Sequence, residues 1–359
     1  MGAENVKRGS GGRRRVLMMR RIVGLMLCAL AVAAATPARP APAPSRPVTL
    51  DQRVRAVVAK AHGVWGVSVR HVERHESAGV RENERFNMAS VFKVPILVGL
   101  FHQASEGKIA LDERVEWKDP GRYFGSGVLQ AMRPGLNPTI HDLATLMIIL
   151  SDNAATDQLL ARVGKANVNA RLRALGLTKT SVDASTREHT LEAFGLRGPK
   201  YRDFTPADVA KFDFQAHEAE IERNQREALR DCHNCSTPSE MSQLFEKIVS
   251  GLAGDPVATS DMLGILSKQQ FNQRLPRLLP VGIRVAHKTG TVTNPVWVVN
   301  DAGIIYLPNG EHVVVSVFSH GTDMNQDEVQ LKKAFNDAED TIAEIGKVVF
   351  DYYTVSGAK

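Results

Sequence analysis

Long apolar runs are missing from this 359-residue sequence beyond its first forty residues, so nothing after them predicts a membrane-spanning helix. Internal repeats are missing as well. Apolar residues make up 43% of the chain, close to the average for globular proteins. A chain of this length and composition can bury a full core in one large domain or in two intimate ones.

No nucleic-acid-binding module and no basic patch stand out in the body of the chain, although the formal net charge is +6. Seven lysines and arginines against one glutamate within the first 21 residues account for the whole excess. The remaining sequence is therefore close to neutral. We expect no nucleic-acid partner, because the high isoelectric point belongs to the start of the chain alone.

The basic start is followed by a short apolar stretch over residues 22–35, in which Ala33 and Ala35 fit an A-x-A processing site. This pattern predicts a cleaved export signal over residues 1–35 and an Ala/Pro-rich linker over residues 36–47. The alternative is a single membrane anchor, for which the apolar run is short. We expect an exported bacterial protein, periplasmic or secreted, with no stable membrane span after processing.

Cysteine is scarce, and one of the three cysteines, Cys28, lies within the predicted signal. Cys232 and Cys235 then remain, and in an exported protein their C-x-x-C spacing favours a local disulfide. Two alternatives stay open. One is half a zinc site completed by His217 or His233, which lacks a second ligand pair, and the other is a redox-active pair.

Secondary-structure signals at the two ends of the chain are clear. Residues 48–61 have helical spacing and residues 64–72 alternate like a strand. Near the other end, residues 296–307 and 312–320 are strand-like runs joined by a Pro-Asn-Gly turn, which is a strong hairpin signal. Residues 326–353 are predicted to form a closing amphipathic helix.

The middle of the chain, roughly residues 90–268, is mostly helical in pattern, with few strand signals. Strands from both ends around a helical middle indicate an α/β fold. We predict an antiparallel sheet built from both chain ends and packed with helices, plus an inserted all-helical subdomain. Residues 48–353 would form one catalytic domain.

A reactive serine is predicted at Ser90 by the pattern Ser90-x-x-Lys93. A helix starting at Ser90 brings the Lys93 amine onto the same face one turn later, so that the hydroxyl has a base beside it. The pair Ser105-x-x-Lys108 also fits this pattern. Ser90 is preferred because an apolar helical run follows it, whereas a glycine after Ser105 indicates the end of a helix.

Two tripeptides add to this signal. Ser151-Asp152-Asn153 closes an apolar helix, and its alternative explanation is a helix N-cap, since all three residue types are favoured there. Lys288-Thr289-Gly290, followed by Thr291, lies in a strand-like stretch where Gly290 would let a ligand approach the backbone. Its alternative explanation is a bend at a strand end with an exposed lysine.

Together the three elements resemble the S-x-x-K, S-D-N and K-T-G motifs of class A β-lactamases and related penicillin-binding proteins. The resemblance covers residues 48–353 and implies the β-lactamase/transpeptidase-like fold. It also implies an acyl-enzyme mechanism. Ser90 is implied as the nucleophile and Lys93 as a general base, with Ser151 passing a proton to the leaving nitrogen under the influence of Lys288.

Substrate contacts are implied by the same resemblance. The backbone amides of Ser90 and Thr291 would form the oxyanion hole, and Asn153 would orient the side-chain amide of the substrate. Thr289 and Thr291, with Lys288 and the close approach at Gly290, would hold a substrate carboxylate.

A substrate carboxylate also calls for a fork-shaped donor. The family places an arginine either in the strand after K-T-G or in the segment before it. Residues 300–302, Asn-Asp-Ala, leave the first place empty, and Arg274, fourteen positions before Lys288, fits the second. The alternative for Arg274 is an exposed surface arginine.

Release of the acyl group depends in this family on a glutamate in an E-x-x-L-N loop. Glu188 fits by position, and Leu191 is in register, but Glu192 replaces the asparagine. Two carboxylates sharing a site would raise the pKa of one of them and alter how water is held. The alternative for Glu188 is a solvated loop carboxylate.

An insertion separates this loop from a later helix, which opens with Thr237-Pro238 and a predicted capping box. The inserted residues, about 193–235, include a charged stretch over 218–230 that is typical of a solvated helix. Because it follows the catalytic loop, the insertion would cover or reshape the entrance to the site.

The predicted function is a serine hydrolase that opens the β-lactam amide through an acyl-enzyme on Ser90. The rivals are a peptidoglycan D,D-peptidase or amidase with the same residues, and a non-hydrolytic penicillin-binding sensor. The substrate would be a small β-lactam or a peptidoglycan-like molecule. We expect no cofactor and no metal, and a monomer.

Overall fold

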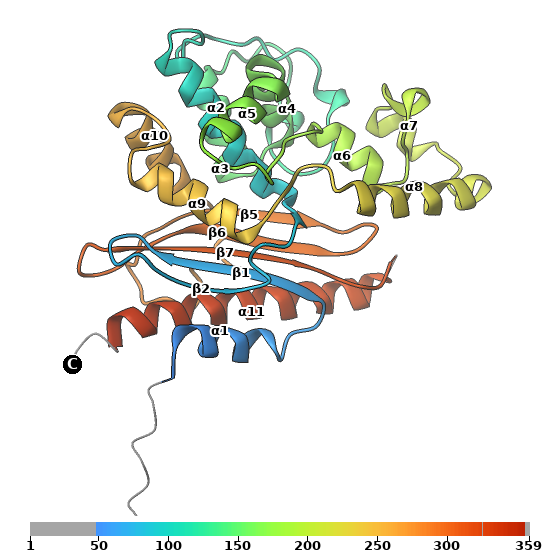
Figure 1. Ribbon diagram of the computed structural model, residues 1–359. Helices are drawn as coiled ribbons and strands as arrows, with labels where there is room; N and C mark the ends of the chain where they lie inside the picture. The colour runs from blue at the N-terminus through green and yellow to red at the C-terminus, as the bar shows by residue number, and fades with distance from the viewer. Residues whose placement is uncertain (1–47, 325, 356–359) are drawn as a thin grey trace, which may run out of the picture. The chain divides into compact units, whose positions relative to one another are not determined.

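An antiparallel sheet of five strands forms the centre of the computed structural model, which describes residues 48–324 and 326–355 (Figure 1). The predicted export signal and linker lie outside the described residues. Within the described residues, no helix is both long and apolar enough to cross a membrane.

The sheet combines strands from the two ends of the chain, as predicted. Its order is β2 (Glu76–Val80), β1 (Val64–His71), β7 (His312–His320), β6 (Val298–Tyr306) and β5 (Val285–Val292). Every neighbouring pair is antiparallel. The predicted hairpin is β6–β7, which pairs Tyr306 with His312 across the turn. β5 is left as an edge strand.

One face of the sheet is covered by the two terminal helices, α1 (Leu50–Val58) and α11 (Glu328–Val355) (Figure 1). A capping box at Thr49 starts α1. Apolar side chains of both helices form one core with the strands beneath them, including Val54, Ile342 and Val315. The closing helix is thus confirmed, because its apolar stripe has a sheet face to cover.

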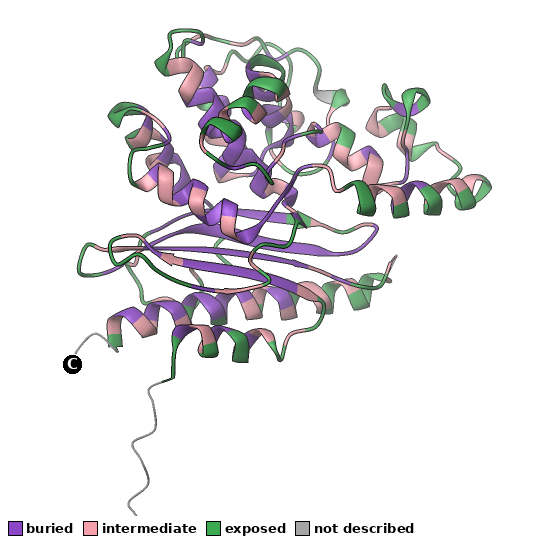
Figure 2. Ribbon diagram, viewed as in Figure 1, coloured by how far each residue is buried: buried purple, intermediate pink, exposed green. Residues whose placement is uncertain are grey.

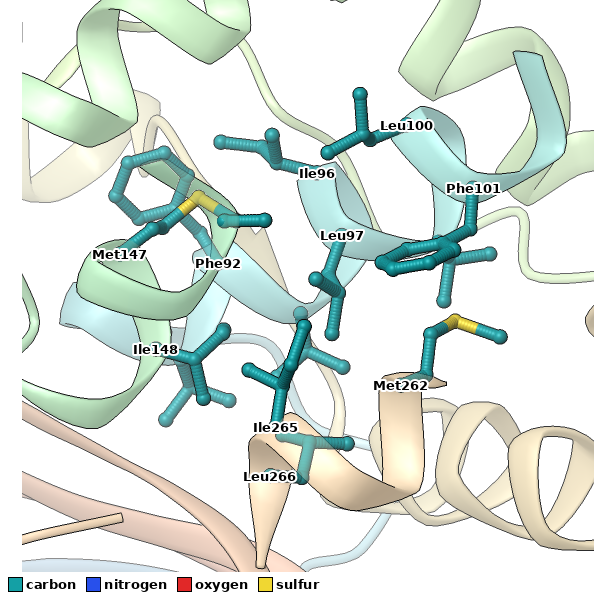
Figure 3. Packing of buried hydrophobic residues seen from close by; sticks show 14 of the residues in the cluster. Phe92, Ile96, Leu97, Leu100, Phe101, Met147, Ile148, Met262, Ile265 and Leu266 are labelled. Atoms are coloured by element: carbon teal, nitrogen blue, oxygen red, sulfur yellow. The ribbon is translucent and has the colours of Figure 1, made fainter. Parts of the chain in front are cut away.

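The opposite face carries the helical middle of the chain, which Figure 2 shows as buried where it meets the sheet. Its main helices are α2 (Lys93–Ser105), α3 (Ile140–Ile149), α4 (Asn153–Val163), α5 (Lys165–Ala174), α9 (Pro238–Val249) and α10 (Pro256–Leu266). The first nine residues of α2 are all buried. Figure 3 shows Phe101 of α2 beside Met262 of α10, and Phe92, just before α2, beside Met147 of α3, all in one apolar core.

Two helix starts differ from the prediction. α2 begins at Lys93 and is preceded by a 3-10 turn, η1 (Ala89–Phe92), so Ser90 lies in that turn. At α9, the Thr237 hydroxyl accepts from the Glu240 amide, but Glu240 does not cap in return. The carboxylate of Glu240 instead accepts from the amide of Lys179 and the hydroxyl of Thr180. Only half of the predicted capping box is therefore present.

The inserted part packs on the helix before it, α6 (Thr186–Ala193), through a small apolar cluster in which Tyr201 and Leu196 contact Leu191 of α6. The inserted part contains α7 (Pro206–Ala210) and α8 (Glu218–Asp231), so the helix expected over residues 218–230 is present. The predicted disulfide joins Cys232 and Cys235 directly after α8. Both sulfur atoms are used in it, which removes the ligands of the zinc alternative.

A two-stranded pairing ties this segment to the nucleophile turn. β4 (Cys235–Ser236) pairs with β3 (Phe86–Asn87), and the Met88 amide donates to the carbonyl of Asn234. The turn that contains Ser90 therefore begins from a strand held by the disulfide segment.

Candidate active site

A cavity of about 440 Å³ lies between the edge strand β5 and the helical middle of the chain. It is lined by residues from η1, β5, α6 and the loop over residues 124–126. Six of the predicted site residues line it: Ser90, Ser151, Asn153, Arg274, Thr289 and Thr291. Lys93 and Lys288 are fully buried.

Ser90 sits in a tightly built turn. Ala89, directly before it, has a φ of +45°, a conformation that L residues seldom adopt and that costs free energy. Gly290 of β5 comes so close that a Cβ atom there would lie 2.5 Å from the Met88 carbonyl oxygen and 3.2 Å from the Ser90 nitrogen. Only glycine fits at this position, and the K-T-G strand therefore passes directly beside the Ser90 amide.

Lys93 is surrounded by acceptors from the S-D-N segment. Its Nζ donates to the Ser151 carbonyl at 2.7 Å, to Ser151 Oγ at 3.0 Å and to Asn153 Oδ1 at 2.7 Å. Burial lowers the pKa of Lys93 to about 7, against the opposing charges of Asp157 and Asp152. An amine with this pKa has a substantial neutral fraction near neutral pH, which is what a general base requires.

The S-D-N segment serves both of the purposes considered for it. Asp152 is the N-cap of α4, and its Oδ1 accepts from the Ala155 amide at 3.0 Å. Ser151 has a φ of +54° and lines the cavity. The capping alternative is therefore right for the aspartate, while the residues on either side of it face the site.

Asn153 holds the site together through both ends of its amide. Its Oδ1 accepts from Lys93, and its Nδ2 donates to the Phe124 carbonyl at 2.8 Å. Gly125, with a φ of +76°, passes so close that a Cβ atom would lie 2.7 Å from Asn153 Nδ2. The amide that was expected to orient a substrate is thus already engaged by the protein.

Ser126 is a site residue that the sequence interpretation missed. Its Oγ donates to the Ser151 carbonyl at 2.7 Å, and the residue lines the cavity beside Phe124. The flanking glycines, Gly125 and Gly127, both have positive φ. The sequence signal for Ser126 was a serine between two glycines. The neighbouring sequence does not indicate that this loop contacts the S-D-N segment.

Lys288 is not the exposed strand-end lysine of the alternative explanation. Its side chain is fully buried, and its Nζ donates to the Thr289 carbonyl at 2.7 Å. Burial lowers its pKa well below the usual value, and the charge of Lys93 acts in the same direction. Because side chains alternate along a strand, Lys288 and Gly290 face the same side, toward the turn of Ser90.

Arg274 lies against the K-T-G strand and is only 5% exposed, so the surface alternative is wrong. Its Nη1 donates to the carbonyls of Gly290 and Asn300 at 2.8 and 2.6 Å. Its Nη2 donates to Thr291 Oγ1 at 2.6 Å, and Nε donates to Glu339 at 3.2 Å. Contacts among the described residues use four of its five N–H groups, so Arg274 has one left for a ligand and not the expected free fork.

Glu188 is not brought to the site, which corrects its predicted placement. It forms a capping box with Ser185 at the start of α6, and its Oε2 lies 3.0 Å from Lys165 Nζ. Partial burial raises the pKa of Glu188, but hydrogen bonds from the Ser185 amide and Lys165 outweigh this and lower it. The side chain is exposed, as the solvated alternative described.

The physical reason lies in the helical period of α6. Thr186, His189, Thr190 and Ala193 line the cavity, and their spacing of three and four residues defines one face. Glu188 falls on another face. Glu192 also lies outside this cavity, and its carboxylate accepts a hydrogen bond from His233 at 2.9 Å. Glu188 and Glu192 were expected to share a site, and the structure does not bring them together.

His189 is a second residue that the sequence interpretation missed. Asn87 Oδ1 accepts from the Ala89 amide at 2.7 Å, which leaves Asn87 Nδ2 as the donor to His189 Nε2 at 3.1 Å. Nε2 is therefore an acceptor, which requires a neutral ring. Burial lowers the pKa of His189 accordingly. The residue connects α6 to the turn that holds Ser90.

Comparison with known proteins identifies the family. Residues 49–353 match the family model described as the Beta-lactamase enzyme family. Beta-lactamase L2 of Stenotrophomonas maltophilia is 31% identical over 278 residues, 74% of this chain and 77% of L2. A β-lactamase structure from Sphaerobacter thermophilus is 25% identical, with a TM-score of 0.65 over 85% of this chain and 97% of that one.

A third likeness concerns the fold alone. A PBP-A variant, solved as an acyl-enzyme complex with penicillin G, is 24% identical with a TM-score of 0.64 and covers 87% of this chain and 98% of its own. The family model spans most of the sequence, and the site elements lie inside the matched residues. The chain belongs to the β-lactamase enzyme family and is a β-lactamase-like hydrolase.

Proposed function

We propose that this protein is a class A-type serine enzyme whose Ser90 is acylated by the amide of a β-lactam ring. The observation that carries this proposal is the environment of Lys93. This lysine is fully buried, has a pKa of about 7 and donates to both Ser151 and Asn153. It follows Ser90 by three residues, within one turn, where a base for the hydroxyl is needed.

The acylation step then proceeds with a defined proton path. Ser90 Oγ bonds to the carbonyl carbon while the C–N bond of the ring breaks. Neutral Lys93 takes the proton of Ser90, Ser151 gives its hydroxyl proton to the leaving nitrogen, and the proton on Lys93 then restores the Ser151 hydroxyl. The 3.0 Å contact between Lys93 Nζ and Ser151 Oγ supports this relay. In its ammonium form, Lys288 would favour proton loss from Ser151 through its charge.

Negative charge on the carbonyl oxygen would be met by the backbone amides of Ser90 and Thr291. Support comes from Gly290, whose missing side chain lets β5 approach the Ser90 nitrogen. Two amides fixed by a strand and a turn need no rearrangement during the reaction, and one such donor is typically worth about 3 kcal/mol of barrier.

A carboxylate on the substrate would bind at the other end of the cavity. Thr289 and Thr291 line it there, and Arg274 has one N–H group free beside Thr291. Lys288, in its ammonium form, would add positive charge next to Thr289. These groups would orient the β-lactam so that its carbonyl meets Ser90.

We infer that the acyl group is released without Glu188, and therefore slowly. Among the described residues that line the cavity, Glu339 is the carboxylate, and it accepts from Arg274. A second candidate function follows from this placement. A D,D-peptidase, or a penicillin-binding sensor that stays acylated, needs the same acylating residues and no glutamate for hydrolysis of the β-lactam ester.

Two substrates separate these functions: a chromogenic cephalosporin and a fluorescent penicillin, each added to the purified chain from residue 36 onward. Steady colour formation supports the β-lactamase, and a persistent covalent label with little turnover supports the second candidate. Ser90→Ala should abolish both signals. Ser105→Ala is the matched control, because Ser105 belongs to the other S-x-x-K match and lies at the exposed end of α2.

Export and a monomeric state belong to the same proposal. The export signal rests on the pattern of residues 1–35, and the disulfide between Cys232 and Cys235 fits an oxidising compartment.

A further inference from the structure

A second cavity of about 560 Å³ adjoins the candidate active site. The two cavities share four lining residues, His189 and Ala193 of α6 and Val292 and Asn294 at the end of β5. A ligand bound at Ser90 that extends between α6 and this strand end would therefore enter the second cavity.

The inserted segment forms one wall of this second cavity. α8 contributes Arg226, Leu229 and Arg230, and the disulfide segment contributes Cys232 and His233. The opposite wall is formed mainly by the strand ends, with Arg85 and Phe86 before the nucleophile turn and Pro295 and Val296 after β5. The insertion was predicted to shape the entrance to the site, and its residues line the cavity next to the site.

The charges in this cavity are unbalanced. Of the described residues that line it, three are arginines, Arg85, Arg226 and Arg230, and one is a carboxylate, Glu192. Glu192 is engaged elsewhere, with His233 at 2.9 Å and Arg197 at 3.4 Å.

The guanidinium groups of these three arginines have N–H donors available for a ligand. Within the described residues, Arg85 and Arg230 have no carboxylate within ion-pair distance, and Arg226 has only Glu222 at 3.9 Å. Apolar side chains alternate with these arginines, namely Phe86, Leu229, Val296 and Met324. The lining therefore suits a group that is anionic at one point and apolar over the rest.

We propose that this cavity is a second substrate subsite, which binds a carboxylate on the acyl side of the substrate. This inference rests on the proposed function, since it requires the substrate to react at Ser90. The carboxylate at the Arg274 end and the carboxylate in the second cavity would then be separate groups of one molecule. The preferred substrates are β-lactams or peptides with an acidic acyl side chain.

The test uses two penicillins that differ by one carboxylate, benzylpenicillin and its α-carboxylated analogue carbenicillin. The second-order rate constant of acylation is measured for both with the unmodified chain and with the double variant Arg226→Gln/Arg230→Gln. The ratio of carbenicillin to benzylpenicillin should fall about fivefold in the double variant, as expected for two partly exposed charge pairs. The difference in this ratio between the unmodified chain and the double variant should decrease at high salt, because salt screens exposed charges.

Arg223→Gln is the matched control, because Arg223 is an exposed arginine of α8 that does not line the cavity. It should leave the ratio unchanged. A ratio that is equal in all three proteins, with both penicillins still acylating Ser90, would overturn the subsite and leave the proposed function standing. Failure of both penicillins to acylate the unmodified chain would overturn the proposed function, and the subsite with it.

Discussion

Lys93 Nζ and Ser151 Oγ lie 3.0 Å apart in a setting where the lysine is fully buried and the serine is 5% exposed. Burial at such a site favours the uncharged amine, whereas the charges of Asp157 and Asp152 favour the ammonium form. Burial dominates, and the pKa of Lys93 falls to about 7. The contact therefore joins Lys93, which is partly neutral near pH 7, to the Ser151 hydroxyl, which can accept a proton from Lys93 and donate one to the substrate.

The rate of acylation should rise with pH through a midpoint near 7. Lys93 acts as a base only when it is neutral, and the neutral fraction increases as pH rises through the pKa of about 7. Stopped-flow measurement of acylation by a fluorescent penicillin between about pH 5 and pH 9 checks this. A rate that is flat over this range, with the protein still folded, would remove Lys93 from the role of base.

Asp157→Asn should move that midpoint to lower pH. The charge of Asp157 raises the pKa of Lys93, so removing it lets burial lower the pKa further. Asp157 also accepts from the amides of Thr186 and Arg187 at 2.7 and 3.1 Å, and an asparagine can satisfy only one of them. We therefore also expect a loss of about 1–2 kcal/mol in the free energy of unfolding.

The same pH series run on Asp208→Asn provides the comparison for Asp157. Asp208 is an exposed capping residue of α7 and does not act on Lys93. The pH midpoint of acylation in Asp208→Asn should match that of the unmodified chain. A midpoint that stays in place, or rises, in the Asp157 variant contradicts the account of the Lys93 pKa.

Glu188→Gln should change turnover of a chromogenic cephalosporin by less than about twofold. The carboxylate points away from the cavity, and its partners are Ser185 and the exposed Lys165. Loss of an exposed ion pair and part of a cap should lower the free energy of unfolding by about 1 kcal/mol or less. Intact-mass measurement during turnover is the check, and a trapped acyl-enzyme in this variant would restore Glu188 to the mechanism.

Arg274→Lys should slow acylation by β-lactams that carry a carboxylate. Lysine cannot reproduce the contacts to Gly290, Asn300 and Thr291 together, and one charge-assisted hydrogen bond is worth about 1.5–3 kcal/mol. We expect a decrease of about 10- to 100-fold for benzylpenicillin. The methyl ester of benzylpenicillin lacks the charge and should show a smaller decrease, whereas equal decreases would indicate damage to the strand alone.

Elements with strong local patterns were predictable from the sequence. Strand-like runs on both sides of a strong turn signal predicted the β6–β7 hairpin, alternation predicted β1, and an apolar stripe predicted α11, although the strands are buried almost continuously because helices cover both faces of the sheet. The three motifs were also recognisable, because their chemistry depends on residues adjacent in the chain. The convergence of Lys93 with Ser151 and Asn153 was correctly expected from them.

The placement of Glu188 shows where local information was present but outweighed by the motif. Ser185-x-x-Glu188 is itself a capping-box pattern, and it predicts that the glutamate turns back to the start of its helix. By contrast, the hydrogen bond between Asn87 and His189 joins residues 102 positions apart. No periodicity or spacing indicates such a pair, because it depends on how β3 and α6 meet in space.

The most direct test of the central claim is the intact mass of the protein after brief incubation with benzylpenicillin, followed by peptide mapping. We predict a mass increase equal to one whole penicillin molecule, located on the peptide that contains Ser90 and absent in Ser90→Ala. An adduct that persists in Ser90→Ala, or that maps to a different peptide, would contradict acylation at Ser90.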